Sequence, residues 1–361
     1  MTTGAGHADP RRWRTVATEV AVPVAAIGLA LVLGAIAIAV AGADPVGSYG
    51  ALVGGAVGGP TALAATLLRS LPIVLAGIGM GLAFRAGAFN LGGEGQMIVG
   101  ALAAAIVAGW VGAASPAPLG LLTGVGAGMA AGAAWAVVPA LLQVRLDVPI
   151  LITSLLLNYI GNLLAAYAVG YPFRDLSGGA ALAQTAMVPE AARLPLLPDT
   201  RLHLGLLLIV LLPLAIAWFL RRTVPGYELR MTGHNPQFAE YGGVRTGRVT
   251  LLVMLASGAI CGLGGSLLVL GVSYRYTDTM ITSAGYAWSG FIAAVLTLAN
   301  PILTAVASVF LGALQVGAAG MARATQVPLQ LADVVQATII IVVAVRPGLR
   351  AFIRRRLRGR S

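Results

Sequence analysis

The sequence predicts an all-α polytopic membrane protein, and three observations carry that prediction. Of 361 residues, 58% are hydrophobic and only 10% are charged. The mean hydropathy of the chain is +0.90. Because a soluble domain carries about 25% charged residues, water cannot be the main solvent of this chain. Long apolar stretches also follow one another with short connections, and arginines cluster on alternating connections.

Ten apolar segments are expected to form membrane spans, because about 20 apolar residues in a helix cross the ~30 Å hydrocarbon core. These segments are 20–41, 61–84, 95–111, 119–142, 149–169, 203–220, 249–271, 287–299, 302–320 and 331–346. The eighth is short for a crossing, so we expect it to be tilted, broken or re-entrant. The glycine-rich stretch 42–59 could hold a partial helix of its own.

The arginines predict which side of the membrane each connection occupies. Cytoplasmic connections are enriched in lysine and arginine, and all 23 basic residues here are arginines. With the N-terminus in the cytoplasm and ten crossings, 17 of the 23 fall on the cytoplasmic side. An odd number of crossings would leave one arginine-rich end outside. We therefore expect an even number of crossings, with both termini in the cytoplasm.

This topology predicts a simple domain organisation. A cytoplasmic N-terminal tail, 1–19, precedes a transmembrane domain, 20–346, and a basic cytoplasmic tail follows at 347–361. The first apolar stretch is longer than the apolar core of a signal peptide, so we expect a retained span. The longest extracytoplasmic connection is 171–202, which is rich in proline, and the largest cytoplasmic connection is 221–248.

Composition also excludes several classes of function. The net charge of +11 lies in short clusters between apolar runs rather than on one patch, which argues against nucleic-acid binding. The single cysteine, Cys261, allows no intramolecular disulfide, and the three histidines have no metal-ligand spacing. No nucleophile–base or metal constellation appears, so a membrane enzyme is disfavoured, and a structural scaffold is a further alternative.

The cytoplasmic connection 221–248 contains the sequence of a short, capped helix. Asn235 suits the N-cap, and Pro236 suits the first helical position, where its missing N–H costs nothing. Gly242 and Gly243 can end the helix, which predicts about two turns over 236–241. Such a helix is too short to be stable alone, so the membrane domain or a partner must hold it. The alternative is an ordinary surface loop with a fortuitous cap.

Polar residues between two apolar spans mark a second segment, FRAGAFNLGGEGQ at 84–96. Its Asn90, Glu94 and Gln96 would be costly at membrane depth unless they face a cavity or find partners. The alternative is a tight cytoplasmic turn with Glu94 at a helix N-terminus, where a negative charge is favourable. Further polar residues lie within spans, among them Asn158, Tyr159 and Gln315. Their two readings are interhelical hydrogen bonds and a solute pathway.

Four ordered segments resemble the motifs of one family. FRAGAFNLGGEGQ resembles the FNIGxEGQ signature of ABC importer permeases for nucleosides and simple sugars, the branched-chain amino acid/ribose-type family. VPILITSLLLNYI resembles the segment that ends in MLNYI, and TGHNPQFAEYGGV resembles the cytoplasmic motif G-x-N-x-x-A-x-x-x-G-I. SAGYAWSGFIAAVLTLANP is similar to the stretch G-x-G-F-x-x-I-A-V-A-L-L-G-x-x-x-P. The resemblance covers about residues 60–345 and is closest to nucleoside-type permeases.

The resemblance implies a type II-like ABC importer permease bundle and assigns residues to two roles. Residues of the cytoplasmic motif would dock on an ATPase; these are Gly233, Asn235, Pro236, Ala239, Glu240, Tyr241 and Gly242. Residues near the other motifs and within the spans would line the translocation path; these are Asn90, Glu94, Gln96, Asn158, Tyr159, Trp288, Phe291 and Gln315. The chain lacks G-x-x-x-x-G-K-[ST], so this reading puts ATP and Mg on a partner and no cofactor or metal here.

The implied partners are ABC ATPase subunits, a second permease that is a paralogue, an extracytoplasmic substrate-binding lipoprotein and the lipid bilayer. The implied location is the cytoplasmic (inner) membrane of a bacterium. An ion-coupled secondary transporter is the alternative, but it needs ionisable groups deep in the bundle, whereas Glu94 and Asp333 lie near span ends. A permease for a simple sugar or a branched-chain amino acid also remains open.

Overall fold

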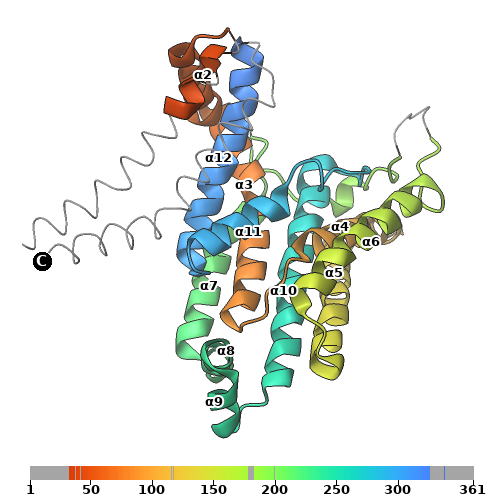
Figure 1. Ribbon diagram of the computed structural model, residues 1–361. Helices are drawn as coiled ribbons and strands as arrows, with labels where there is room; N and C mark the ends of the chain where they lie inside the picture. The colour runs from red at the N-terminus through yellow and green to blue at the C-terminus, as the bar shows by residue number, and fades with distance from the viewer. Residues whose placement is uncertain are drawn as a thin grey trace, which may run out of the picture. The chain divides into compact units, whose positions relative to one another are not determined.

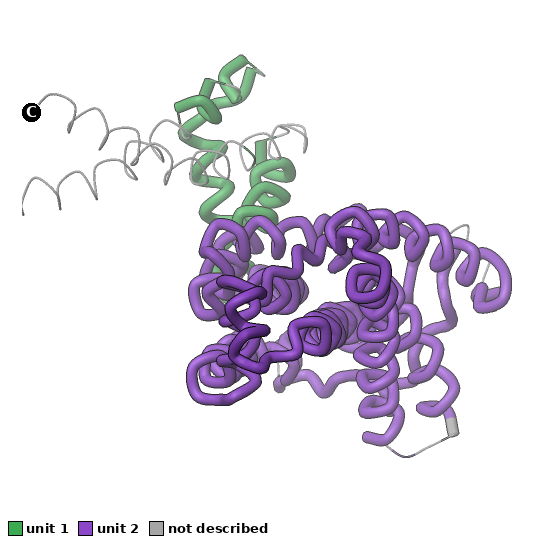
Figure 2. Tube along the Cα trace, turned by 60° about the horizontal axis from the view of Figure 1, so that its bottom comes forward, with its two compact units in different colours: residues 1–62, 314–361 green, residues 63–313 purple. Residues whose placement is uncertain are grey.

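The structure, a computed structural model, describes residues 32–36, 38–40, 42–114, 116, 118–177, 183–198, 200–325 and 337. These residues are mainly helical, and the β-pairing among them amounts to two isolated bridges. The all-α prediction is confirmed (Figure 1). The chain divides into two compact units, 1–62 with 314–361 and 63–313 (Figure 2).

The described helices follow the predicted spans closely. Their bounds are α2 Pro45–Val57, α3 Pro60–Arg85, α4 Gly93–Ala114, α5 Leu119–Leu146, α6 Ile150–Gly170, η1 Glu190–Ala192, η2 Leu204–Leu207, α7 Leu208–Arg222, α8 Val224–His234, α9 Pro236–Tyr241, α10 Thr246–Leu268, the π-helical η3 Val269–Ser273, α11 Tyr286–Leu296 and α12 Pro301–Thr325. The helix α2 confirms the partial helix expected within 42–59. Asp44 caps it by accepting hydrogen bonds from the Val46 and Gly47 amides.

Seven helices in the described part of the chain are long and apolar enough to cross a membrane. They coincide with the predicted spans from 61–84 to 249–271 and with 302–320. The eighth predicted span, 287–299, forms the 11-residue α11, which is too short for a straight crossing. Predicted spans 20–41 and 331–346 lie largely outside the described residues, as do both tails. The count of ten and the side of the termini therefore stay predictions.

Glycines bring the backbones of α4, α5 and α10 into direct contact at the centre of the larger unit. A β-carbon on Gly128 would collide with Ser266 Oγ and lie 2.7 Å from the Gly100 carbonyl oxygen. In lipid the hydrophobic effect does not drive helices together, so close approach between small residues supplies the packing energy. Within the glycine-rich run 120–132, the buried glycines recur every four residues and form the packing face of α5; these are Gly120, Gly124, Gly128 and Gly132.

The two ends of the larger unit have different character. At one end, the proline-rich connection 171–202 pairs with the residues after α10: the Thr185 amide donates to the Tyr276 carbonyl at 2.9 Å, and the Val188 amide donates to the Tyr274 carbonyl at 2.8 Å. At the other end lie Arg85, Arg145 and the connection from α7 to α10 (Figure 1). The positive-inside rule assigns that second end to the cytoplasm.

The cytoplasmic connection 221–248 is more helical than the sequence suggested. Besides the expected short helix it contains α8, which the sequence analysis did not predict. Thr223 caps α8 by accepting a hydrogen bond from the Gly226 amide at 3.1 Å. Pro225 falls in the first turn, where it breaks no helical hydrogen bond. Pro225 and the glycines look like turn signals in the sequence, but here they start and pack a helix.

We predict that Gly128→Ala destabilises the protein by about 2–3 kcal/mol, because the added methyl group forces α5 away from α10 and α4. The matched control is Gly126→Ala on the same helix, where a β-carbon would meet no atom within 4 Å. That control should be neutral or stabilising by up to ~1 kcal/mol, from helix propensity. The measurement is thermal unfolding of the purified variants in detergent; equal effects of the two substitutions would contradict the packing assignment.

Candidate coupling site and solute path

The short helix α9 forms where the sequence predicted it. The Asn235 Oδ1 accepts a hydrogen bond from the Phe238 amide at 3.0 Å, and Pro236 occupies the first turn. The chain leaves the helix through Gly243, whose φ of +83° favours glycine. The Val244 amide then donates back to the Ala239 carbonyl at 3.0 Å. The capped-helix prediction is confirmed, and its role in coupling stays a prediction.

One face of α9 is attached to the protein and the other is bare. Ala239 is buried, and the Thr246 hydroxyl donates a hydrogen bond to the Glu240 carboxylate. On the other face, Phe238 is 60% exposed and Tyr241 is 92% exposed. The sequence analysis named Tyr241 but missed Phe238. Large exposed aromatic side chains on a small, fixed helix are typical anchors of a protein–protein interface.

The helix α8 fastens α9 to the membrane helices through two glycines. A β-carbon on Gly233 would collide with the Arg85 carbonyl oxygen at the end of α3, and one on Gly226 would collide with the Phe219 carbonyl oxygen near the end of α7. These glycines are seven residues apart, or two turns, so they share one face of α8. Leu229 lies between them, 4% exposed, in the same buried cluster as Leu82.

The end of α3 is tied in turn to the short helix α11. The Arg85 Nε donates a hydrogen bond to the Ala299 carbonyl at 3.0 Å. Ala299 lies in the turn between α11 and α12 and has a φ of +54°, which is sparsely populated by residues other than glycine. Direct contacts therefore lead from α9 through α8 and α3 to the turn after α11.

The connection from α3 to α4 holds a buried amide cluster. The Asn90 Nδ2 donates to the Ser257 Oγ on α10 at 2.9 Å, and the Gln96 Nε2 donates to the Asn90 Oδ1 at 3.1 Å. The Asn90 Oδ1 also accepts from the Gly92 amide at 2.9 Å. Both Asn90 and Gln96 are at most 1% exposed. Their amide groups form hydrogen bonds with each other, with the Gly92 amide and with Ser257, as is usual for buried polar groups.

Asn158 joins the same connection from α6. Its Oδ1 accepts from the Gly95 amide at 2.8 Å, and its Nδ2 donates to the Leu91 carbonyl at 2.9 Å. Buried irregular backbone is tolerated where protein groups satisfy its hydrogen bonds. The structure thus brings Asn90, Gln96 and Asn158 together, and these contacts support the interhelical hydrogen-bond reading. Their place in a solute path stays a prediction.

Glu94 lies in the first turn of α4 and is 9% exposed. It forms no ion pair within the described part of the chain. This position fits the reading in which the helix dipole stabilises its charge. Tyr159 follows Asn158 on α6 but is 68% exposed, so the two side chains face different surroundings. Gln315 belongs to the other compact unit and is not placed relative to these residues.

Trp288 and Phe291 belong to a row of four aromatic side chains, the aromatic row. The Trp288 and Phe291 ring centroids on α11 are 6.0 Å apart, and Phe84 of α3 lies 5.8 Å from Phe291. Phe89, on the connection after α3, lies 5.4 Å from Phe84. The sequence analysis missed Phe84 and Phe89 as site residues, although both lie inside the motif FRAGAFN.

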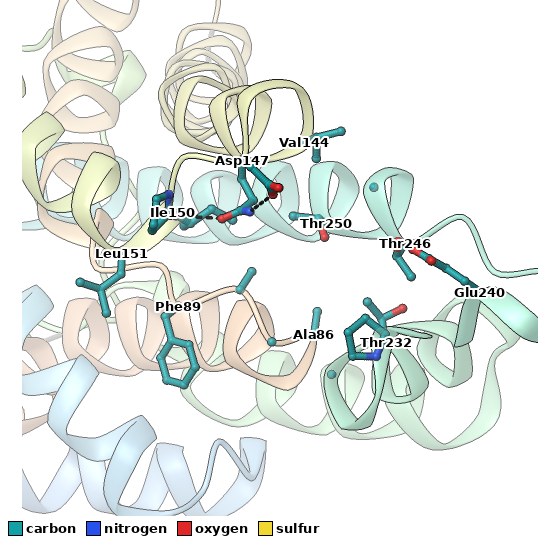
Figure 3. Close-up of a pocket in the computed structure, with 17 residues that line it drawn as sticks. Ala86, Phe89, Val144, Asp147, Ile150, Leu151, Thr232, Glu240, Thr246 and Thr250 are labelled. Carbon is teal, nitrogen blue, oxygen red and sulfur yellow. Dashed lines mark hydrogen bonds between the residues drawn. The ribbon is translucent and has the colours of Figure 1, made fainter. Parts of the chain in front are cut away.

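A cavity of about 800 Å³ lies at the cytoplasmic end (Figure 3). Its wall is formed by the connection after α3, the end of α5 with the start of α6, the helices α8 and α9, and the start of α10. Phe89, Asp147 and Glu240 are among the labelled side chains that line it (Figure 3). Residues from the connections that the arginines predict to be cytoplasmic thus meet around one cavity, while the side of the membrane stays a prediction.

The membrane-length helices, with α8 and α9 in the connection between two of them, fit a membrane-embedded transport subunit. Residues 62–344 match the family described as branched-chain amino acid transport system / permease component, and the chain belongs to this family. It is thus the permease subunit of an ABC transporter and a multi-pass protein of the cytoplasmic (inner) membrane.

Relatives named as guanosine or glucose permeases are similar over most of the chain. The guanosine ABC transporter permease protein NupP of Bacillus subtilis (strain 168) is 33% identical over 91% of this chain and 94% of its own length. The glucose ABC transporter permease protein TsgB13 of Haloferax volcanii is 32% identical over 92% of this chain and 89% of its own length. NupQ, a second guanosine ABC transporter permease protein of Bacillus subtilis, is 28% identical over 62% of this chain and 71% of its own length.

We predict that Asn158→Ala destabilises the protein by about 2–4 kcal/mol, because the Gly95 amide and the Leu91 carbonyl lose their buried partner. Asn162→Ala, one turn further along α6, is the control. It removes a hydrogen bond from Thr282 at an exposed position and should cost under about 0.5 kcal/mol. The measurement is detergent-phase thermal unfolding. An Asn158→Ala protein of normal stability that fails in transport would instead favour a role in the solute path.

Proposed function

We propose that this chain is one permease of an ABC importer that carries a nucleoside into the cytoplasm. Separate ABC ATPases supply the energy, a paralogous second permease completes the membrane unit, and an extracytoplasmic lipoprotein delivers the solute. One observation carries this proposal. The helix α9 presents two solvent-exposed aromatic side chains, and the preceding helix α8 packs closely against the ends of α3 and α7. In that arrangement an ATPase bound to α9 would move α8 and the ends of the membrane helices α3 and α7.

The proposal places ATP and Mg on the partner subunits. The chain has no lysine and no G-x-x-x-x-G-K-[ST], so it offers no Walker A site. A helix of six residues is unstable alone, so other contacts must stabilise α9. Docking of an ATPase on its exposed face would give such a helix a function. The likeness to both NupP and NupQ, two guanosine permeases of one organism, supports a paralogue as the second permease.

A simple sugar is the second candidate solute, because TsgB13 is nearly as similar as NupP. A secondary transporter is less well supported, since Glu94 lies in the first turn of α4 rather than deep within a span. Proteoliposomes that contain both permeases, the ATPase and the binding protein test all three readings. We expect nucleoside uptake that requires internal ATP. Uptake driven by an ion gradient without ATP would overturn the importer proposal. ATP-dependent uptake of glucose but not of nucleosides would show that the solute is a sugar.

We predict that the double substitution Phe238→Ala and Tyr241→Ala prevents co-purification of the ATPase. Loss of two exposed anchors typically costs 2 kcal/mol or more each at an interface, which is about 30-fold or more in affinity per residue. Membrane insertion should be unaffected, because neither side chain packs in the protein interior. The paired control is Leu214→Ala and Val210→Ala on α7, two exposed apolar residues away from α9. Normal ATPase recovery with the first pair would refute the docking assignment.

We predict that Gly233→Ala uncouples hydrolysis from transport. The methyl group pushes α8 off the end of α3, while the exposed face of α9 remains able to bind the ATPase. The complex should therefore assemble and hydrolyse ATP, but uptake per ATP should fall by about tenfold or more. Gly109→Ala is the control, because a β-carbon there meets no atom within 4 Å. Parallel loss of assembly and uptake would show that Gly233 serves folding only.

A further inference from the structure

We propose that the aromatic row Trp288–Phe291–Phe84–Phe89 binds the planar base of the solute and selects base-bearing solutes over free sugars. This inference rests on the proposed importer function and adds the residues that set its specificity. It assigns a solute-contacting role to Phe84 and Phe89 and names what Trp288 and Phe291 recognise.

The geometry of the row is continuous. Neighbouring ring centroids are 6.0, 5.8 and 5.4 Å apart, all within the range of direct aromatic contact. Trp288 and Phe291 are three residues apart on α11, so they share one face of that helix. Phe84 is in the last turn of α3, and Phe89 follows after the chain has turned. Three separate segments thus contribute to one row.

Phe84 and Phe291 pack against the buried hydrophobic cluster of the protein, and the exposed rings at the two ends of the row are the ones available to a ligand. Phe89 is 54% exposed and Trp288 is 43% exposed, while Phe84 and Phe291 between them are half-buried. Phe89 lies on the connection between α3 and α4, outside any span, and it lines the cytoplasmic cavity (Figure 3). A row that served lipid contact would not continue into a cavity at the arginine-rich end.

The chemistry of the row suits a nucleobase. Every base has a flat π-face, and stacking on an aromatic side chain contributes to binding without requiring a particular base. A free sugar has no such face. Several similar stacking positions in sequence would let a base move from one ring to the next, and a pathway needs such weak, repeated sites.

The cavity adds a second selection. Two carboxylates, Asp147 and Glu240, line it, and no arginine is among the residues of its wall. Carboxylates accept hydrogen bonds from the hydroxyl groups of a ribose, but they repel a phosphate. An unphosphorylated nucleoside with its base on Phe89 matches both features, whereas a nucleotide does not.

The test is uptake by the full complex, with both permeases, the ATPase and the binding protein in proteoliposomes. Phe291→Leu and Trp288→Leu keep an apolar side chain but remove the π-face. We expect each to reduce kcat/KM for guanosine, adenosine and uridine uptake by about 5- to 50-fold. Phe291→Tyr, which keeps the ring, should restore uptake to within about twofold of wild type. The matched control is Trp218→Leu, a 63% exposed tryptophan on α7 outside the row, which should not change uptake.

A second measurement does not depend on variants that fold. The wild-type complex is photolabelled with 8-azidoguanosine, and the labelled peptides are identified. We expect label on peptides that contain 84–89 and 286–291, with protection by excess guanosine and not by excess ribose or glucose. Label confined to other peptides would overturn the inference.

The outcomes separate this inference from the proposed function. If the wild-type complex takes up no nucleoside, the proposed function fails. If wild-type uptake is normal and Phe291→Leu and Trp288→Leu match Trp218→Leu, the importer proposal stands and the role of the row is refuted. If the leucine variants lose the second permease during purification, the row is an interface between permeases and the inference is again refuted.

Discussion

The contact between Gly233 of α8 and the Arg85 carbonyl at the end of α3 is the constraint on which the cytoplasmic half of this structure depends. No side chain separates the two backbones, because even a β-carbon at Gly233 would collide with that oxygen. The contact is therefore stiff, as close-packed interiors are. It attaches the six-residue helix α9, through α8, to the membrane helix α3, and in the proposed coupling a force on α9 would act on α3.

The α3–α4 connection, which follows this contact along the chain, is held by hydrogen bonds from buried amide side chains rather than by a regular helix. Asn90 joins the connection after α3 to α10, and Asn158 joins it to α6. A discrete network of this kind can hold one arrangement firmly and exchange it for another as a unit. Arg85 and Phe84, on the last turn of α3, contact the Ala299 carbonyl and Phe291, so in the proposed coupling a movement of α3 would reach both.

Much of this architecture could be predicted from the sequence, because the relevant signals are local. Apolar length located the spans, and the sequence Asn235-Pro236 located α9 and its cap. The helix α8 was missed because Pro225 and Gly226 have the same appearance in a helical first turn as in a loop. The amide cluster and the aromatic row could not be predicted, since they depend on which segments meet. Nothing near Phe84 in the sequence indicates that Phe291 lies beside it, more than 200 residues later.

The most direct measurement of the central claim is a distance between α9 and α7 during the ATPase cycle. In a Cys261→Ser background, spin labels at Gln237→Cys of α9 and Leu214→Cys of α7 would report it by pulsed electron paramagnetic resonance in the assembled complex. A second pair, Gln237→Cys and Leu146→Cys at the end of α5, spans the cytoplasmic cavity. If α8 fixes α9 to the membrane helices, ATP should leave the first distance unchanged within about 2 Å while the second changes. A first distance that shifts by about 5 Å or more, with the second unchanged, would contradict the account.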